Sequence, residues 1–333
     1  MKNLILTLLC TSISWVATAQ DEIRKITLVE DTEQSSSVYN YYTGDVLLEI
    51  PSQGIHEFRI NTGAGEVEIT PSTLPVITVE AEVVIMAGNS KKANNYLSRD
   101  LKLSLEKKGG QAILISSFDY LQEKENSETM NPFDFLKSPD RQINLKISVP
   151  KNIFLNIDDN SGDLILANLM NDIDIHDGSG LIYLNNIDGD VVIDDNSGDI
   201  VLKNINKQNP QNHKITIYDN SGGIRLEKLR GETSITDASG DIRITDLVGS
   251  LSINDASGEI RLSNIEGDLK LDDSSGDIIS RTVAGNVEVY DSSGDIYIRD
   301  VLLDVNIKMA GAGDLTLEEV RGKISGDLRK LNN

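Results

Sequence analysis

Apolar and polar residues after residue 150 follow a pattern that repeats every 18 residues. The dipeptide Ser-Gly marks this repeat, and successive copies are separated by 18, 18, 24, 18, 18, 18 and 18 residues. The copies begin at Ser161, Ser179, Ser197, Ser221, Ser239, Ser257, Ser275 and Ser293. The one longer step contains Pro210, which cannot donate to a β ladder and therefore belongs in a protruding loop.

Each repeat predicts two short strands and two turns. In the unit that starts at Ser239, the apolar positions are Ile242, Ile244, Leu247, Leu251 and Ile253. Apolar residues two positions apart have the period of a β-strand. A unit of this length cannot bury its own apolar face, whereas stacked units can. The pattern therefore predicts an all-β protein, a single-stranded parallel β-helix (β-solenoid) with about nine 18-residue coils after residue 150.

Two other repeat architectures have similar lengths. A left-handed hexapeptide helix would place an inward aliphatic residue every six positions, but here the apolar residues follow the Ser-Gly glycine by 2, 4, 7, 11 and 13 positions. This spacing excludes the hexapeptide helix. A calcium-binding β-roll has nine-residue halves and aspartate-rich turns, but its repeat contains more glycine. The chain resembles a β-roll only in part.

Residues 20–150 lack an exact repeat but also predict strands, which we expect at 23–29, 46–50, 57–60, 66–69, 76–85, 102–106, 112–115 and 143–149. Residues 89–100 predict a short helix with Asn89 or Ser90 as its N-cap. The end of a solenoid exposes edge strands and core. We therefore interpret residues 20–150 as irregular β coils with a capping helix, and residues 151–333 as the regular solenoid.

A long polar insertion at 117–141 separates two of these strands. It contains Phe118, Tyr120, Phe133 and Phe135, and so holds three of the five phenylalanines. Long loops in compact folds are usually functional or disordered. These aromatic residues either fold back to cover the solenoid or bind a partner, and disorder of the segment is the third interpretation.

Residues 1–19 have the features of a secretory signal peptide. Lys2 precedes an apolar run from Leu4 to Val16, and Ala-Thr-Ala precedes Gln20 as a cleavage site. The apolar run is too short to span a membrane. We therefore expect secretion to the periplasm or the cell surface. The only cysteine, Cys10, would leave with the signal, so we expect no disulfide.

The order of these features resembles a known bacterial family. The resemblance rests on the strand-rich HEFRINTGAGEVEIT at 56–70, on I-x-V-P at 147–150, and on coils of the form D-x-S-G-D-I-x-L. Over about residues 45–330 the chain is similar to secreted β-strand-repeat domains of unknown function described as putative adhesins, and to the head domain of autotransporter-type adhesins. The resemblance implies a solenoid with an adhesin-like role, and it brings no catalytic motif.

Stacked coils would align acidic residues in two columns. The first column lies two residues before each Ser-Gly serine and comprises Asp159, Asp177, Asp195, Asp219, Asp237, Asp255, Asp273 and Asp291. The second follows the glycine and comprises Asp163, Asp199, Asp241, Glu259, Asp277, Asp295 and Asp314. Aspartate and serine bond to turn backbone, and exposed charges one coil apart repel by only about 1 kcal/mol in water. These facts favour a solvated ladder of turn residues.

Two functional interpretations of these columns stay open. Calcium could bridge adjacent coils through carboxylate oxygens. The candidate calcium ligands are Asp195, Asp219, Asp237, Asp255, Asp273 and Asp291. Alternatively, the columns could bind a cationic surface.

Tyrosines offer a separate candidate site. Tyr183, Tyr218, Tyr290 and Tyr297 fall at outward or turn positions without one shared register, and rings on a flat sheet could stack on sugars. We take Tyr290 and Tyr297 as the candidate glycan-binding pair. For catalysis, the even spread of acids singles out no acid–base pair. The three histidines, His56, His176 and His213, join no serine or metal constellation in the sequence.

Composition excludes some partners. The chain has 53 acidic and 31 basic residues, for a net charge of −22, which argues against nucleic acid and anionic lipid. We expect a secreted, non-enzymatic protein with an adhesin-like surface, whose partner is a cell-surface glycan or an envelope protein. An envelope scaffold that assembles through the 117–141 loop is the alternative, and a polysaccharide-active enzyme is less favoured. No cofactor is expected except, in the alternative interpretation above, calcium.

Overall fold

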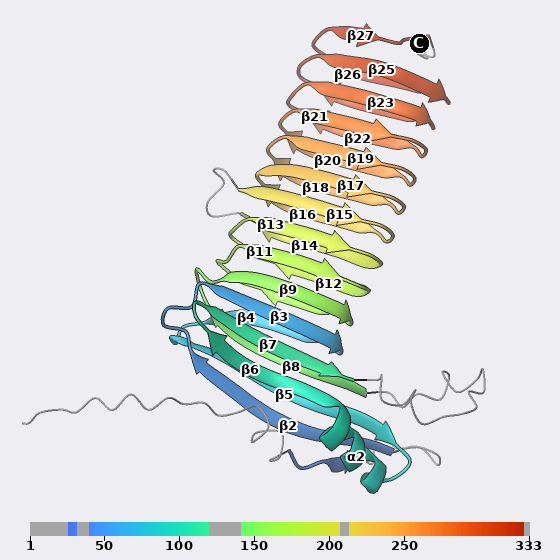
Figure 1. Cartoon of the computed structure of the whole chain (residues 1–333). Coiled ribbons are helices and arrows are strands. Elements are labelled where there is room, and N and C mark those ends of the chain that lie inside the picture. Colours follow the sequence, from blue (N-terminus) through green and yellow to red (C-terminus); the bar gives the residue numbers. More distant parts are fainter. Residues whose placement is uncertain (1–25, 32–39, 120–140, 207–212, 330–333) are drawn as a thin grey trace, which may run out of the picture.

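A computed structural model describes residues 26–31, 40–119, 141–206 and 213–329 of the chain. The expected signal peptide and residues 120–140 of the insertion lie outside these ranges. The described chain forms a tall stack of coils, with the C-terminal coils at one end and the N-terminal elements at the other (Figure 1). Two long sheets face each other across this stack. They are called sheet A and sheet B below.

Sheet A has 14 strands and sheet B has 13. In spatial order, sheet A consists of β1 (Val29–Asp31), β2 (Asn40–Pro51), β5 (Val76–Ala87), β8 (Arg141–Pro150), β4 (Val67–Ser72), β10 (Leu164–Ala167), β12 (Gly180–Asn185), β14 (Gly198–Ile205), β16 (Ile224–Arg230), β18 (Ile242–Val248), β20 (Ile260–Glu266), β22 (Ile278–Val283), β24 (Ile296–Val301) and β26 (Leu315–Val320). Sheet B consists of β27 (Ile324–Gly326), β25 (Val305–Ala312), β23 (Val287–Ser293), β21 (Leu269–Asp273), β19 (Leu251–Asp255), β17 (Glu232–Asp237), β15 (Lys214–Asp219), β13 (Val191–Asp195), β11 (Ile173–Asp177), β9 (Phe154–Ser161), β3 (Glu57–Ala64), β7 (Gln111–Phe118) and β6 (Leu101–Lys108).

The regular part of the solenoid has the predicted nine coils, from β9–β10 to β25–β26. Each coil contributes one strand to sheet B and the next to sheet A, and neighbouring coils pair in parallel. Equivalent residues align across coils, as Ile242 does with Ile260 and Leu251 with Leu269. This register stacks the apolar positions of all coils into one continuous core, and it confirms the predicted β-solenoid.

The interior is narrow because it lies between two sheets whose strands are connected by short turns along both sides. The five predicted apolar residues of the coil that starts at Ser239 are all 2% exposed or less. The strand period of two places a sixth side chain of each coil inside as well. In that coil it is Asp255, which is 1% exposed.

The Ser-Gly glycines allow the coils to stack closely. Gly240 has φ +147°, and a Cβ there would lie 1.6 Å from the carbonyl oxygen of Gly222 in the preceding coil. Only glycine has both the freedom to adopt this φ and the missing Cβ. The recurring dipeptide therefore marks the turn where the backbones of adjacent coils approach most closely.

The N-terminal region joins the solenoid out of sequence order. The coil β3–β4 pairs with β9 and β10 on one side and with β7 and β8 on the other. Beyond β8, the pairs β5–β8, β2–β5 and β6–β7 are antiparallel. Figure 1 shows the blue β3 and β4 above the green β7 and β8. The antiparallel strands end the parallel stack.

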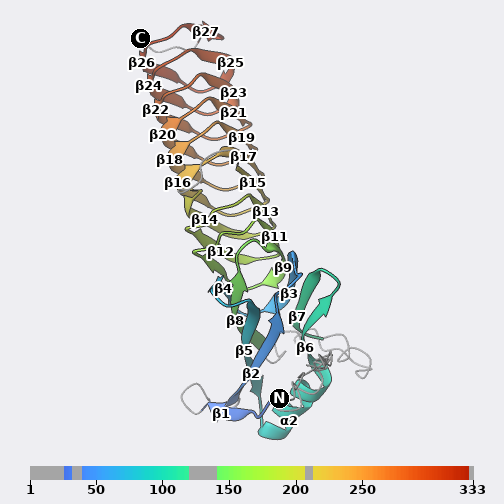
Figure 2. The ribbon, with the colours of Figure 1, turned by 90° about the vertical axis from the view of Figure 1, so that its left-hand side faces the viewer.

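A short helix completes this end of the molecule. Helix α2 (Ser90–Asp100) begins where the sequence predicted, with the Asn89 side chain accepting a 3.0 Å hydrogen bond from the backbone N–H of Lys92. It lies at the base of the stack (Figure 2). The fully buried Arg141 of β8 donates through Nη1 to Oδ2 of Asp100 at 2.7 Å, and its guanidinium lies 4.2 Å from the centre of the Tyr96 ring. These contacts fasten the helix to the sheet.

Candidate functional site

The first acidic column runs inside the solenoid and not along its solvated surface. Its members lie at or near the ends of sheet B strands, where the alternation of side chains turns them inward. All eight are 5% exposed or less: Asp159, Asp177, Asp195, Asp219, Asp237, Asp255, Asp273 and Asp291. The prediction of a solvated ladder is therefore wrong for this column. We call it the buried Asp column.

One oxygen of most of these carboxyls caps the turn that follows. Oδ1 of Asp237 accepts a 3.0 Å hydrogen bond from the backbone N–H of Ser239, and Asp255 does the same for Ser257. The second oxygen, Oδ2, of both residues is buried without a hydrogen-bond partner in the described part of the chain. Such a carboxyl either holds a proton or needs a counter-charge, because an unpaired buried charge is costly.

Burial, reinforced by the charges of neighbouring carboxylates, raises the pKa of Asp177, Asp237 and Asp273 to about 7. Burial likewise raises the pKa of Asp159 and Asp219 to about 6. The pKa values of Asp195 and Asp255 are raised by the same desolvation. A column of this kind is partly protonated near neutral pH.

Calcium binding by the buried Asp column stays a prediction. Calcium takes six to eight oxygen ligands. The Oδ1 atoms of Asp195, Asp237 and Asp273 already accept backbone hydrogen bonds, which leaves mainly Oδ2 for an ion. The structure thus provides free carboxylate oxygens, but few of them per coil.

The second acidic column is exposed, apart from the partly buried Glu259, and it links successive coils. Oδ1 of Asp241 accepts from the backbone N–H of Glu259 at 3.0 Å, and Oδ1 of Asp277 accepts from that of Asp295 at 2.9 Å. Asp163 and Asp199 bond the next coil in the same way. These contacts agree with the predicted turn chemistry.

The candidate tyrosines divide between the two faces. Tyr290 belongs to β23 in sheet B, whereas Tyr297 belongs to β24 in sheet A. The two rings therefore cannot form one flat binding face. Within each sheet a shared register does exist, because Tyr218 and Tyr290 occupy one column of sheet B, and Tyr183 and Tyr297 occupy one column of sheet A. The four tyrosines therefore share no single register, as expected, and instead form one pair in each sheet.

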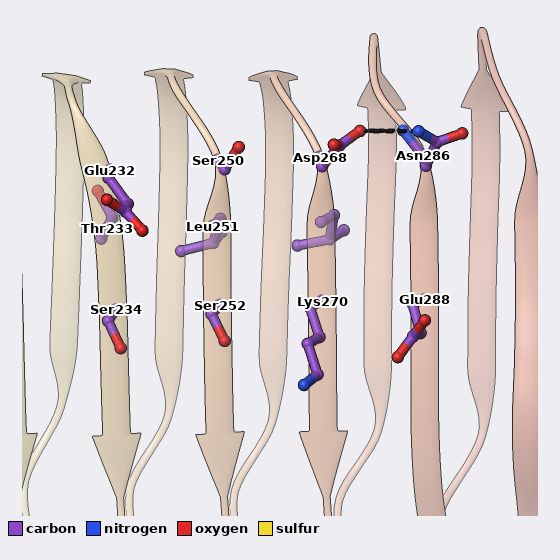
Figure 3. A pocket seen from close by; sticks show the side chains of 11 residues that line it. Glu232, Thr233, Ser234, Ser250, Leu251, Ser252, Asp268, Lys270, Asn286 and Glu288 are labelled. Carbon is purple, nitrogen blue, oxygen red and sulfur yellow. Dashed lines mark hydrogen bonds between the residues drawn. The ribbon is translucent and has the colours of Figure 1, made fainter.

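A shallow depression of about 530 Å³ lies on sheet B, over β17, β19, β21 and β23. Its volume is within the range of small-molecule sites. Figure 3 shows Ser234, Ser252, Lys270 and Glu288 side by side on these four strands, with Glu232 and Ser250 nearer the strand starts. The two serines have short side chains and leave open space beside the longer Lys270 and Glu288. Sequence reasoning missed this site, although the run of small outward residues was visible.

Of the four aromatic residues of the insertion, only Phe118 lies within the described residues. Phe118 ends β7 and is 9% exposed, with its ring 6.0 Å from the guanidinium of Arg141. It packs into the core and is not a surface binding residue, because the strand continues further into the predicted insertion than expected. Tyr120, Phe133 and Phe135 lie outside the described residues.

Two histidines stand beside carboxylates. In the described residues, Asp172, Asp190 and His213 bring potential metal-ligating atoms within 4.8 Å of one another, which the sequence analysis did not foresee. Oδ1 of Asp190 is 3.0 Å from Nδ1 of His213 and also accepts from the backbone N–H of Lys214. The two carboxylates of this cluster are exposed, and Asp190 caps a turn. Nδ1 of His176 lies 3.6 Å from Oδ2 of Asp194.

No helix in the described ranges is long and apolar enough to cross a membrane.

Comparison with solved structures finds similar chains. One is a putative cell adhesion protein from Clostridium sporogenes ATCC 15579, with a TM-score of 0.32 and 11% identity, covering 73% of this chain and 99% of that one. A putative lipid binding protein from Parabacteroides distasonis ATCC 8503 has a TM-score of 0.29 and 15% identity, covering 85% and 96%. A putative adhesin from the same organism has a TM-score of 0.27 and 13% identity, covering 85% and 94%.

The curated proteins contain no match to this chain. A family model does match, over residues 56–298, and this range includes the β3–β4 coil, seven complete regular coils and most of the eighth. The chain therefore belongs to the Toastrack DUF4097 family, a domain family of unknown function.

Proposed function

We propose that the protein is a secreted, non-enzymatic binding protein whose rigid solenoid faces act as an adhesin-like surface. The observation that carries the proposal is the regular outer face of each sheet, where side chains repeat in register from coil to coil. Parallel pairing fixes the spacing between strands at about 4.8 Å. Such a face presents an extended ligand with a row of equally spaced contacts.

The arrangement of charged residues supports binding in preference to catalysis. The acids near the turns are held by repeat chemistry, as Asp241 and Asp277 are by the backbone of the next coil. General acid–base catalysis needs a carboxyl within hydrogen-bond reach of the reacting group. The members of the buried Asp column lie inside the solenoid, where a polysaccharide does not reach them.

Direct binding tests the proposal. The mature chain, residues 20–333, is labelled and titrated against isolated bacterial envelopes and a panel of polysaccharides, with calcium and with a chelator. We expect saturable binding to at least one glycan or to the envelopes. An unrelated protein of equal net charge serves as the control. Absence of saturable binding to every probe overturns the proposal.

The comparison of binding with calcium and with a chelator tests the calcium interpretation separately. Loss of binding, or a lower melting temperature, on chelation supports a role for calcium in the protein. Unchanged binding and melting exclude a calcium role in this function.

A further inference from the structure

A patch without charge stands out on the outer face of sheet B. At the starts of β15 and β17 the outward residues are charged, and Lys214 and Glu232 pair there as neighbours. Beyond them, the outward residues of β15 are Thr216 and Tyr218, and those of the next two strands are serine, threonine or asparagine. These next positions are Ser234, Thr236, Ser252 and Asn254, all exposed. We call Thr216 and these four residues the polar patch. Charges border it on both sides, with Asp194 on β13 and Asp272 on β21.

This absence of charge is informative because the protein is strongly acidic. A quarter of its residues are charged, and its net charge is −22. The polar patch instead offers hydroxyl and amide groups, which donate and accept hydrogen bonds without discriminating by charge. Part of it, Ser234 and Ser252, lines the 530 Å³ depression (Figure 3).

Two exposed rings lie in the same column of sheet B as part of the polar patch. Tyr218 is 50% exposed and Tyr290 is 42% exposed. Both lie in the column that contains Thr236, Asn254 and Asp272, four strand steps apart. At the spacing of β-strands this separation is about 19 Å. The column therefore presents an aromatic ring at each end, with the uncharged Thr236 and Asn254 and the acidic Asp272 between them.

We propose that the polar patch, together with the rings of Tyr218 and Tyr290, binds a neutral oligosaccharide that lies across the strands of sheet B, along the axis of the solenoid. This inference rests on the proposed binding function and names its ligand class. Tyrosine combines an apolar ring face with a polar hydroxyl, so it suits a sugar ring, which also has apolar and hydroxylated faces. The hydroxyl and amide groups between the rings would bond sugar hydroxyls.

The surroundings disfavour other ligands. A polyanion needs a basic surface, whereas Lys270 is accompanied by Glu232, Asp272 and Glu288. A peptide strand adds to a free sheet edge, but β17 and β19 are paired on both sides. An apolar ligand would lack an apolar floor. A neutral, hydroxyl-rich chain is compatible with all of these features.

Paired variants test the assignment. The double variant Tyr218→Ala with Tyr290→Ala removes both rings from sheet B, and Ser252→Glu places a long charged side chain in the depression. The matched control is Tyr183→Ala with Tyr297→Ala, which removes two rings from one column of sheet A. Calorimetric titration uses cellohexaose, mannohexaose and chitohexaose as neutral probes and oligogalacturonate as the acidic one. Melting temperatures verify that each variant is folded.

We expect a neutral probe to bind, and each sheet B variant to weaken it about tenfold or more, the equivalent of about 1.4 kcal/mol. The sheet A control should bind as the unchanged protein does. Equal loss in both double variants, no loss in the sheet B variants, or a preference for oligogalacturonate overturns the inference while leaving the proposed function intact. Failure of every glycan, with retention on envelopes, also overturns this inference alone.

Discussion

Among the six inward side chains of each regular coil, five are mostly apolar and one is an aspartate in eight of the nine coils. The aspartate was recognisable in principle, because Asp255 follows the buried Ile253 by two residues and strand alternation turns both inward. The Ser-Gly dipeptide after it makes a turn residue the simpler interpretation. The sequence shows which residues repeat. Because burying a charged carboxyl is usually costly, the sequence alone favours a solvated position for this aspartate.

Asp237→Asn is expected to raise the stability of the protein at pH 8. The pKa of Asp237 is about 7 in the folded chain, above its ordinary value of 3.8. Its contribution to stability is therefore fully present below about pH 4 and is lost as the pH rises through about 7. Asparagine keeps the oxygen that accepts from Ser239 and carries no charge. We expect a gain of about 1–3 kcal/mol in the free energy of unfolding at pH 8.

Denaturant unfolding at pH 5 and pH 8 checks this prediction. The gain should shrink at pH 5, where Asp237 itself is largely protonated. Asp241→Asn is the matched control, because Asp241 also accepts a backbone hydrogen bond but is exposed. A gain that is equal at both pH values, or equal in the control, would contradict the role of the buried Asp column.

At the scale of the coil, close backbone contact at the Ser-Gly turn limits what can replace glycine. Gly258→Ala would place Cβ 1.7 Å from the carbonyl oxygen of Gly240 at a φ of +148°. Because that oxygen is backbone, the two coils must separate locally to relieve the clash. We expect a loss of about 3 kcal/mol or more in the free energy of unfolding, or failure to fold.

Two alanine variants separate the causes. Gly54 has φ +73°, but a Cβ added there would meet nothing within 4 Å, so Gly54→Ala tests backbone strain alone. Gly88→Ala meets neither obstacle and should be close to neutral. Thermal unfolding compares the three, and similar losses for Gly54→Ala and Gly258→Ala would refute the importance of the contact between coils.

The elements were more predictable than their order. The expected strand at 57–60 lies within β3, and the helix begins after Asn89, because both signals are local. The stacking of β7–β8 beneath β3–β4 could not be foreseen. Any two coils with alternating apolar residues offer compatible edges, so local sequence does not say which coil lies next to which. The depression on sheet B is different, because Ser234 and Ser252 are 18 residues apart and the repeat itself makes them neighbours. What the sequence does not show is how the longer side chains of Lys270 and Glu288 border the open space beside these serines.

At the scale of the whole molecule, packed elements cover the N-terminal end of the stack, whereas the regular coils are held together by parallel strand pairing that repeats from coil to coil. Neighbouring coils contribute to stability through their interfaces, and the outer strands of a solenoid need protection from pairing with other chains. Helix α2 and the antiparallel strands provide it at this end. The buried Arg141 connects them, because it reaches from β8 to Asp100 at the end of α2.

Arg141→Ala is expected to loosen this end and promote association of the protein with itself. Without Arg141, the buried Asp100 keeps only Arg99, which is 44% exposed, as a charged partner among the described residues, and the space beside the Tyr96 ring is emptied. We therefore expect a loss of about 3 kcal/mol. Arg59→Ala is the control, since Arg59 pairs with Glu57 at 2.6 Å but is half exposed, and it should cost less than about 1 kcal/mol. Replacing both charges, by Arg141→Met with Asp100→Asn, should recover part of the loss. Light scattering during thermal unfolding measures association together with stability. If Arg141→Ala unfolds earlier without greater association than Arg59→Ala, the ion pair stabilises the fold but does not protect its edge.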